Sequence, residues 1–299
     1  MSLVAELEAR TPPMAALAVA IVAVSTSAIL IRLSGAPSPV KALYRVVFTV
    51  LLLAPIAVAR HREDFRALSR RDLLFASLSG LALAVHFATW FLSVELTTVA
   101  ASVTLVQSQP LFVAIGGAVL LDERIGTRKA TGIAVALAGM AVMSFGDLLV
   151  GANPQGTHTL LGDALAVAGA VAAAGYVLAG RSLRQRVALL PYVTVVYSVC
   201  VLGLLAVVLA QGAPLAGYPA REWLLFFAMA VGPGVFGHTV INWALAHVES
   251  SVVSVSLLGE PVGSTILALL LLAEVPSWVT VAGGAVVLLG IYVTSSARP

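Results

Sequence analysis

The chain has 299 residues, of which 60% are hydrophobic and only 10% are charged, and its net charge is +3. Soluble domains are about 45–50% apolar and about 25% charged, so this excess of apolar residues predicts a protein that is partly solvated by lipid. The single cysteine, Cys200, excludes an intramolecular disulfide framework, and no basic face interleaved with aromatic residues suggests a nucleic-acid partner.

Five apolar segments in the first half are long enough to cross a bilayer. A helix needs about 20 apolar residues to cross about 30 Å of hydrocarbon, and such segments occupy residues 14–31, 40–58, 73–94, 99–121 and 130–145. The first is longer than the apolar region of about 7–15 residues in a signal peptide, which favours a retained span. Residues 60–71 contain five arginines and mark a loop at one membrane face.

The second half repeats this order after a linker at residues 146–159, which is rich in Gly, Asn and Pro. Its spans are predicted at residues 161–179, 191–210, 223–245, 252–272 and 278–294. Continuous apolar runs without two-residue alternation favour helices over the strands of a membrane barrel. The sequence therefore predicts an all-α integral membrane protein of ten helices, in two five-helix domains at residues 14–145 and 160–295.

A constant shift of 151 residues relates the two halves. The pairs related by this shift are Pro110 and Pro261, Glu123 and Glu274, Gly132 and Gly283, and Gly139 and Gly290. Self-similarity at a fixed interval dictates architecture, so the chain is read as a duplicated half. The glycines predict close helix packing. Each glutamate lies shortly before the next span and is predicted to cap that helix.

The basic residues are distributed unevenly across the predicted membrane. Thirteen of the 17 Lys and Arg residues fall on one side if the N-terminus is cytoplasmic, so both termini are predicted to be cytoplasmic. Because each half has an odd number of spans, the second half is inverted relative to the first. Inverted repeats are typical of secondary transporters, in which two similar halves expose a midplane site to each side in turn.

Polar side chains at membrane depth mark a candidate binding site. His86 and Trp90 lie four residues apart on one face of the third span, and His238, Asn242 and Trp243 occupy the corresponding place in the eighth span. Intramembrane polar groups normally face the protein interior or a water-filled cavity. We predict that these residues line one cavity that stacks on and hydrogen-bonds a small organic ligand. In the alternative, the histidines bond neighbouring carbonyls and the tryptophans pack against lipid.

Prolines within the fourth and ninth spans predict helix kinks near mid-membrane. Pro110 comes shortly after Gln107, and Pro261 directly after Glu260; each proline removes an intrahelical bond and frees a carbonyl. Gln107 is a candidate substrate ligand. Glu260 is the one acidic residue predicted at mid-span, and its role is open between proton coupling, substrate anchoring, and a structural partnership with Arg45 or a backbone donor.

Arg45 lies roughly one to two turns into the second span, where its guanidinium can bind a carboxylate through two hydrogen bonds. Lys41 and Arg32 are expected instead to extend to the outer headgroups. Tyr176 is a further candidate for substrate binding, together with Tyr44 and the serines at positions 25 and 27.

The sequence lacks the motifs of the common enzyme, cofactor and metal sites. It has no H-E-x-x-H, no G-x-S-x-G, no P-loop and no Cys/His cluster. We therefore expect no cofactor, no bound metal and no enzymatic activity. An intramembrane enzyme or a non-transporting membrane sensor is the alternative to a carrier.

Three stretches carry a resemblance to a known family: ASVTLVQSQPLFVAIGGAVLLDERI, its echo VVSVSLLGEPVGSTILALLLLAEVP, and GDALAVAGAVAAAGYVLAGRSLR at the start of the second half. With ten predicted helices in doubled halves, the chain resembles the EamA domain of the drug/metabolite transporter superfamily, which includes the YddG-type amino-acid exporters. The resemblance implies a ten-helix transporter of the cytoplasmic membrane with a central cavity. It also implies outward movement of small metabolites such as amino acids, for which proton coupling is a candidate driving force.

Overall fold

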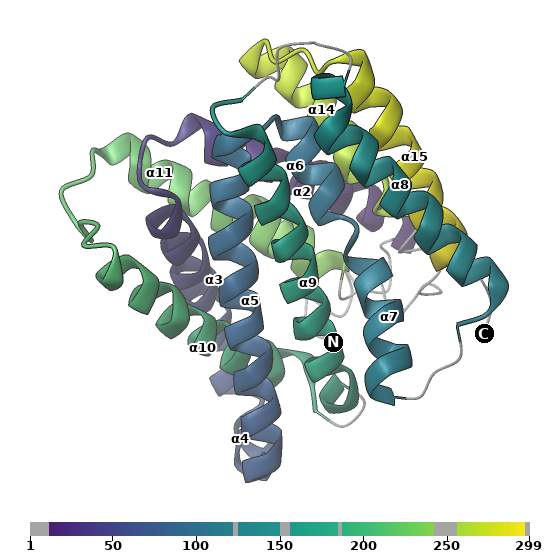
Figure 1. The fold of residues 1–299 in the computed structure, drawn as a ribbon. Helices are drawn as coiled ribbons and strands as arrows, with labels where there is room; N and C mark the ends of the chain where they lie inside the picture. The colour runs from purple at the N-terminus through teal and green to yellow at the C-terminus, as the bar shows by residue number, and fades with distance from the viewer. Residues whose placement is uncertain (1–11, 122–124, 150–155, 185–186, 242–255, 297–299) are drawn as a thin grey trace.

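A computed structural model describes residues 12–121, 125–149, 156–184, 187–241 and 256–296. These ranges consist of helices and turns, and no strand occurs within them (Figure 1). Eight helical segments are long and apolar enough to cross a membrane. The prediction of an all-α, multi-span membrane protein is therefore confirmed.

The helices of the first half are α2 (Pro13–Leu33), α3 (Ser38–Arg60), α4 (Arg62–Ala67), α5 (Arg70–Leu96), α6 (Val99–Val106), α7 (Gln109–Leu121) and α8 (Thr127–Leu149). Local sequence explains where several begin. Prolines stand in the first turn of α2 and α3, where a missing N–H costs nothing. Ser69 and Asp72 form a reciprocal capping box at the start of α5. The α8 helix extends four residues into the segment predicted as linker.

The helices of the second half are α9 (Thr159–Arg184), α10 (Leu189–Ala210), α11 (Ala220–Met229), the π-helical segment η1 (Ala230–Thr239), α14 (Gly259–Leu272) and α15 (Trp278–Ser295). The α11 helix runs directly into η1, which contains Pro233. Proline has no N–H for the regular backbone ladder, and the wider turn of a π-helix accommodates the lost bond. The predicted eighth span continues beyond the described residues.

Helices of the first half pack mainly against helices of the second half. The largest contacts join α8 to α15, α5 to α9 and to α10, α3 to α10, and α2 to η1 and to α14, and α6 also contacts α14 (Figure 1). In the order of the repeats, α3, α6 and α8 thus each pack against their own counterpart. Among the mixed pairs, α5 with α9 and α2 with η1 each join the third span of one half to the first span of the other.

Glycines allow α8 and α15 to approach closely. A Cβ placed on Gly139 would lie 2.6 Å from the backbone nitrogen of Val287 and 2.9 Å from the carbonyl oxygen of Gly283. A Cβ placed on Gly283 would lie 2.8 Å from the nitrogen of Met143. The obstructing atoms are backbone and cannot rotate away, so these positions are the small-residue contacts that bring membrane helices together.

Gly139→Ala is expected to lower the thermal stability of the purified protein. Alanine gains about 1 kcal/mol of helix propensity over glycine, but overpacking against immovable atoms costs about 1–3 kcal/mol and forces the helices apart. Gly175→Ala is the matched control, because its Cβ would meet only the Cβ of Ala82 at 3.8 Å, an ordinary contact. A thermal melt in detergent in which both variants are equally stable would contradict the close approach.

Candidate functional site

The two interrupted membrane segments meet each other at the centre of the site. A turn at residues 107 and 108 interrupts the helix between α6 and α7, and α14 begins at Gly259 after a turn. Pro110 and Pro261 therefore stand in the first turn of a new helix, where proline breaks no intrahelical bond. Gln107 Nε2 donates a 2.6 Å hydrogen bond to Glu260 Oε2. The two residues are 153 positions apart in the chain, and this contact joins the halves.

The α2 helix closes one side of this junction through its serines. Ser25 Oγ donates to the carbonyl oxygen of Ile21 at 2.8 Å and also lies 3.4 Å from the carbonyl oxygen of Glu260. Ser264 Oγ in turn donates to the carbonyl oxygen of Ser25 at 3.1 Å. These hydroxyl-to-carbonyl bonds tie the start of α14 to α2 and hold Glu260 against it.

Arg45 is a buried cation beside aromatic rings. Its side chain is 2% exposed, and Nη1 donates a 3.1 Å hydrogen bond to Ser27 Oγ. The guanidinium carbon lies 4.7 Å from the ring centre of Phe87 and 5.7 Å from that of Phe91. Among the described residues, Arg45 forms no ion pair with a carboxylate, Glu260 included. A direct Arg45–Glu260 salt bridge is therefore absent from this conformation.

Arg45 faces a small cavity of about 20 Å³. The described residues that line it are Arg45, Val46, Thr49, Phe87, Tyr197, Gly234 and His238. A space of this size holds about one water molecule. His238, at the end of η1, is exposed and contributes to the same lining. The cavity collects polar groups from α3, α10 and η1, which belong to both halves.

His86 and Trp90 turn toward the protein interior. Their rings are stacked, with centres 5.9 Å apart and planes 17° apart. His86 Nδ1 lies 2.9 Å from the carbonyl oxygen of Gly169 in α9. Because a carbonyl can only accept, Nδ1 carries the proton, and Nε2 is an acceptor when the ring is neutral. Trp90 is 4% exposed, and its buried Nε1 has no hydrogen-bond partner within the described part of the chain.

Other candidate residues lie apart from this cluster. Tyr44 stacks on Phe226 with ring centres 5.2 Å apart, and its hydroxyl donates to the carbonyl oxygen of Leu215 at 2.5 Å. Tyr176 is half-buried and packs against the core of the bundle. Asn242 and Trp243 lie outside the described residues.

Sequence reasoning missed the aromatic residues around Arg45. Phe87 and Phe91 each follow a selected residue, His86 or Trp90, by one position. Tyr197, in the seventh span, also went unselected. The four-residue spacing of the phenylalanines places both on one helix face, but only the packing of α3 against α5 shows that Arg45 lies over that face.

Lys41 and Arg32 do not extend to the headgroups, so that prediction was wrong. Lys41 is 2% exposed, and its Nζ bonds Glu95 Oε1 at 2.5 Å and the carbonyl oxygen of Ile31 at 3.0 Å. Arg32 Nη2 donates to the carbonyl oxygen of Thr97 at 2.5 Å. The freed carbonyls at these helix ends offer hydrogen bonds that outweigh solvation at the membrane surface.

Glu274 does not cap the helix that follows it, which corrects a second prediction. Ser277 caps α15, accepting the N–H of Thr280 at 3.0 Å. Glu274 Oε1 instead accepts the N–H of Val99, the first residue of α6, at 2.5 Å, and Oε2 lies 3.2 Å from Arg32 Nη2. We call the contacts of Glu274 with Val99 and Arg32 the outer latch, because they lie at the end of the bundle that the arginine bias predicts to be outer.

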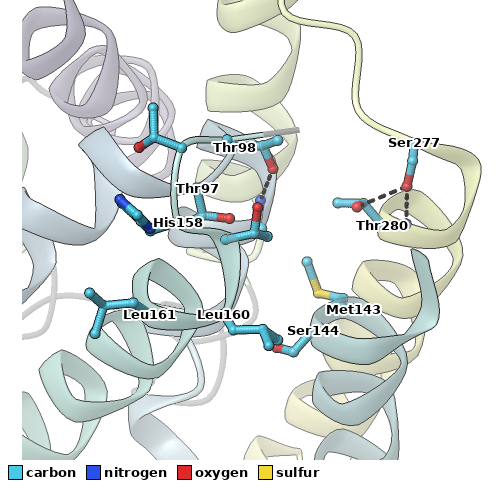
Figure 2. Close-up of a pocket in the computed structure, with 13 residues that line it drawn as sticks. Thr97, Thr98, Met143, Ser144, His158, Leu160, Leu161, Ser277 and Thr280 are labelled. Atoms are coloured by element: carbon cyan, nitrogen blue, oxygen red, sulfur yellow. Dashed lines mark hydrogen bonds between the residues drawn. The ribbon is translucent and has the colours of Figure 1, made fainter. Parts of the chain in front are cut away.

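A second cavity of about 380 Å³ lies beside the outer latch (Figure 2). Figure 2 shows Thr97, Thr98 and His158 on one side of it and Ser277 and Thr280 on the other, with Met143 and Ser144 below. Its lining is rich in hydroxyl groups and contains no carboxylate, lysine or arginine among its described residues. Thr97 borders both features, because its carbonyl accepts from Arg32 and its hydroxyl donates to Asp163 Oδ1 at 2.8 Å.

The chain is similar to known transporter sequences. A relative from Archaeoglobus fulgidus, described as an uncharacterized transporter, is 32% identical over 196 residues, which are 63% of this chain and 65% of the relative. The match thus spans just under two thirds of that relative. A second protein of the same description and organism is 25% identical over 223 residues, 74% of each chain.

A solved crystal structure of a protein shares the fold, with a TM-score of 0.62, 21% identity, and coverage of 94% of this chain and 96% of that one. The profile of the EamA-like transporter family matches residues 12–145 and again residues 160–296. This confirms the resemblance drawn from the repeated stretches. The chain belongs to the EamA-like transporter family.

Proposed function

We propose that the protein is a secondary transporter that exports small metabolites, such as amino acids, across the cytoplasmic membrane by alternating access. The observation that carries this proposal is the contact between Gln107 and Glu260. It joins the broken helices of two family-matched halves beside a buried arginine. Discontinuous helices that meet in mid-membrane form the binding sites of many secondary transporters.

The proposed architecture is ten helices in two inverted repeats, at residues 14–145 and 160–295. Eight of the proposed spans are the long apolar helices. The remaining two are α14 and the α11 helix together with η1. Support comes from the two family matches and from the packing of α3, α6 and α8 against their counterparts. Two similar halves that share one interface can exchange conformations, which is the basis of alternating access.

The proposed substrate site is the space around Arg45, His86, Trp90, Gln107 and His238, with Asn242, Trp243 and Tyr176 as further contributors. Glu260 is proposed as the coupling residue. Several polar contacts hold the helices together at the end of the bundle predicted to be outer. They are the outer latch, the Lys41–Glu95 ion pair, and a hydrogen bond of 3.0 Å from the Gly35 N–H to Glu222. We assign the structure to a state closed to the outside.

Counterflow in proteoliposomes tests the transport function. Vesicles loaded with an unlabelled amino acid are expected to accumulate the labelled form transiently, because only a carrier exchanges internal for external substrate. A panel of amino acids and related amphipathic metabolites identifies the substrate. Failure of every candidate to show transient accumulation, with the protein folded in the vesicles, would favour the membrane sensor or intramembrane enzyme instead.

The proposed topology makes a separate prediction. A reporter fused after Arg298 is expected in the cytoplasm, and one inserted at Asn153 is expected outside, because five spans separate the N-terminus from the linker. Paired alkaline phosphatase and fluorescent-protein fusions measure the side of each position. Reporters found on the same side would contradict the inverted arrangement of five plus five helices.

A further inference from the structure

Arg45 carries a charge that the described residues do not balance. It is almost fully buried, yet its single side-chain hydrogen bond goes to the neutral hydroxyl of Ser27. Buried charges in proteins are normally paired, because removing an ion from water costs several kcal/mol. The faces of Phe87 and Phe91 offset part of that cost through cation–π contact. They do not supply a negative charge.

The nearby carboxylate is already engaged. Glu260 accepts from Gln107 and forms no ion pair with Arg45. A guanidinium has five N–H donors in a planar fork, and the described residues accept from Nη1 alone. The Nε and Nη2 groups form the edge that matches a carboxylate with two parallel hydrogen bonds. Arg45 also lines the central cavity, so this fork is placed where a ligand would lie.

The charge of the site decides between possible ligands. A cation would be repelled by Arg45 in a medium where charges are poorly screened. A doubly charged phosphate would leave one negative charge without a partner, since Arg45 is the one Lys or Arg side chain among the described residues of the cavity lining. A single carboxylate neutralises the guanidinium with the matching geometry.

The surroundings of Arg45 indicate the rest of the ligand. Phe87, Phe91 and Tyr197 present aromatic surface to the cavity or the guanidinium, and Trp90 packs edge-on against Phe91. Aromatic surface of this kind favours an apolar or aromatic body over a sugar or a polyol. The cavity of about 20 Å³ is too small for such a body in this conformation. Its walls come from both halves, so binding such a body requires the halves to move apart.

We infer that Arg45 binds the carboxylate of the transported molecule, and that the substrate class is a monocarboxylate with a bulky apolar or aromatic body. This inference rests on the proposed transport function. The carboxylate is the required group, and an amino group is dispensable. Cationic drugs are excluded from the site.

Isothermal titration calorimetry on the purified full-length protein tests this with three probes that share a phenethyl group. Hydrocinnamate carries the carboxylate, hydrocinnamamide is neutral, and phenethylammonium is a cation. Hydrocinnamate alone is expected to bind. Arg45→Gln is expected to weaken it by about ten- to a hundred-fold, the factor for losing a charge-assisted bidentate contact. Arg45→Lys is expected to lie between the two, because lysine keeps the charge without the fork.

The matched control is Arg71→Gln. Arg71 is an exposed arginine at the start of α5, and its guanidinium carbon lies 5.7 Å from the ring centre of Phe75. This variant is expected to bind hydrocinnamate as the parent does. If Arg45→Gln does not fold, the comparison of acid with amide on the parent protein and on Arg45→Lys decides the question.

Three results would overturn the inference: no binding of hydrocinnamate by the parent, equal binding of acid and amide, or unchanged binding by folded Arg45→Gln. Counterflow with the same probes separates this from the transport proposal. Selective acid binding without counterflow of any substrate would contradict the proposed transport function and support carboxylate binding by Arg45. Counterflow of phenethylammonium equal to that of hydrocinnamate would support the proposed transport function and contradict carboxylate binding by Arg45.

Discussion

Glu260→Gln is expected to abolish the pH dependence of transport while leaving folding and substrate binding largely intact. Glutamine has the shape of a glutamate side chain and keeps an oxygen that accepts from Gln107 Nε2, as Glu260 does at 2.6 Å. It cannot take up or release a proton. A proton that binds one access state better than the other shifts the equilibrium between them, so removal of the titrating group removes this shift.

The size of the expected pH dependence is that of one proton coupled to each transport cycle. For a single coupled group, accumulation can change by about tenfold per pH unit, equivalent to about 1.4 kcal/mol. The measurement is counterflow or efflux from proteoliposomes over a range of pH. Glu260→Asp is expected to retain part of the dependence. Glu63→Gln, on the exposed helix α4, is the matched control and is expected to keep the parent profile.

Glu260 interacts electrostatically with Arg45, and the other titratable groups of the proposed site provide the contrary outcome. Arg45 comes from α3, His86 from α5, Tyr197 from α10 and His238 from η1. If Glu260→Gln transports with the parent pH profile, Glu260 has a structural role at the α6–α14 junction. Coupling would then lie with His86 or His238, since histidine changes charge near neutral pH.

The sequence was sufficient to predict which segments are helical and that the chain is duplicated. Hydropathy and the constant shift between the halves can both be read directly from the sequence. Membrane spans need little more than sufficient length and apolar composition. The glycines of α8 and α15 were also identifiable, because their spacing is independent of the partner helix.

Contacts between segments that are distant in the chain were harder to predict from the sequence. Gln107 and Glu260 were selected separately, and nothing in their local sequence indicates that their side chains meet. Lys41 is a case in which a general rule gave the wrong prediction, because at a helix end a lysine normally extends to water. Here its Nζ finds Glu95 on α5 and the carbonyl of Ile31 on α2. Which carbonyls and carboxylates face a given helix is decided by tertiary packing, which one sequence does not specify.

Glu274→Gln is expected to open the outer side of the protein. The Glu274 carboxylate holds together three segments: the end of α2 through Arg32, the start of α6 through the Val99 N–H, and its own segment before α15. The preceding residue, Ala273, has φ of 53°, the one positive φ of a non-glycine residue in the described ranges. Such a conformation persists where the surroundings enforce it, and here it directs the chain so that Glu274 reaches back to α6.

The outer latch is stronger than a surface ion pair because Glu274 also accepts a backbone N–H at a helix start, where negative charge is favoured. Hydrogen bonds to a charged group contribute about 1.5–3 kcal/mol each. Losing the charge should therefore raise the population open to the outside by about ten- to a hundred-fold. Arg32 would keep its bond to the carbonyl of Thr97, so the fold is expected to survive.

Labelling of a buried cysteine from the outside measures this opening. Ser102 is fully buried in α6 below the outer latch, and Cys200, the one native cysteine, is replaced by alanine to leave Ser102→Cys as the single target. A membrane-impermeant thiol reagent is expected to react slowly in this background and at least about tenfold faster after Glu274→Gln. Ala273→Gly is the matched control. Glycine adopts positive φ without strain, so the carboxylate stays in place and labelling is expected to stay slow. Equal labelling rates with and without Glu274→Gln would show that the outer side is held closed by other contacts, with the Lys41–Glu95 ion pair the next to remove.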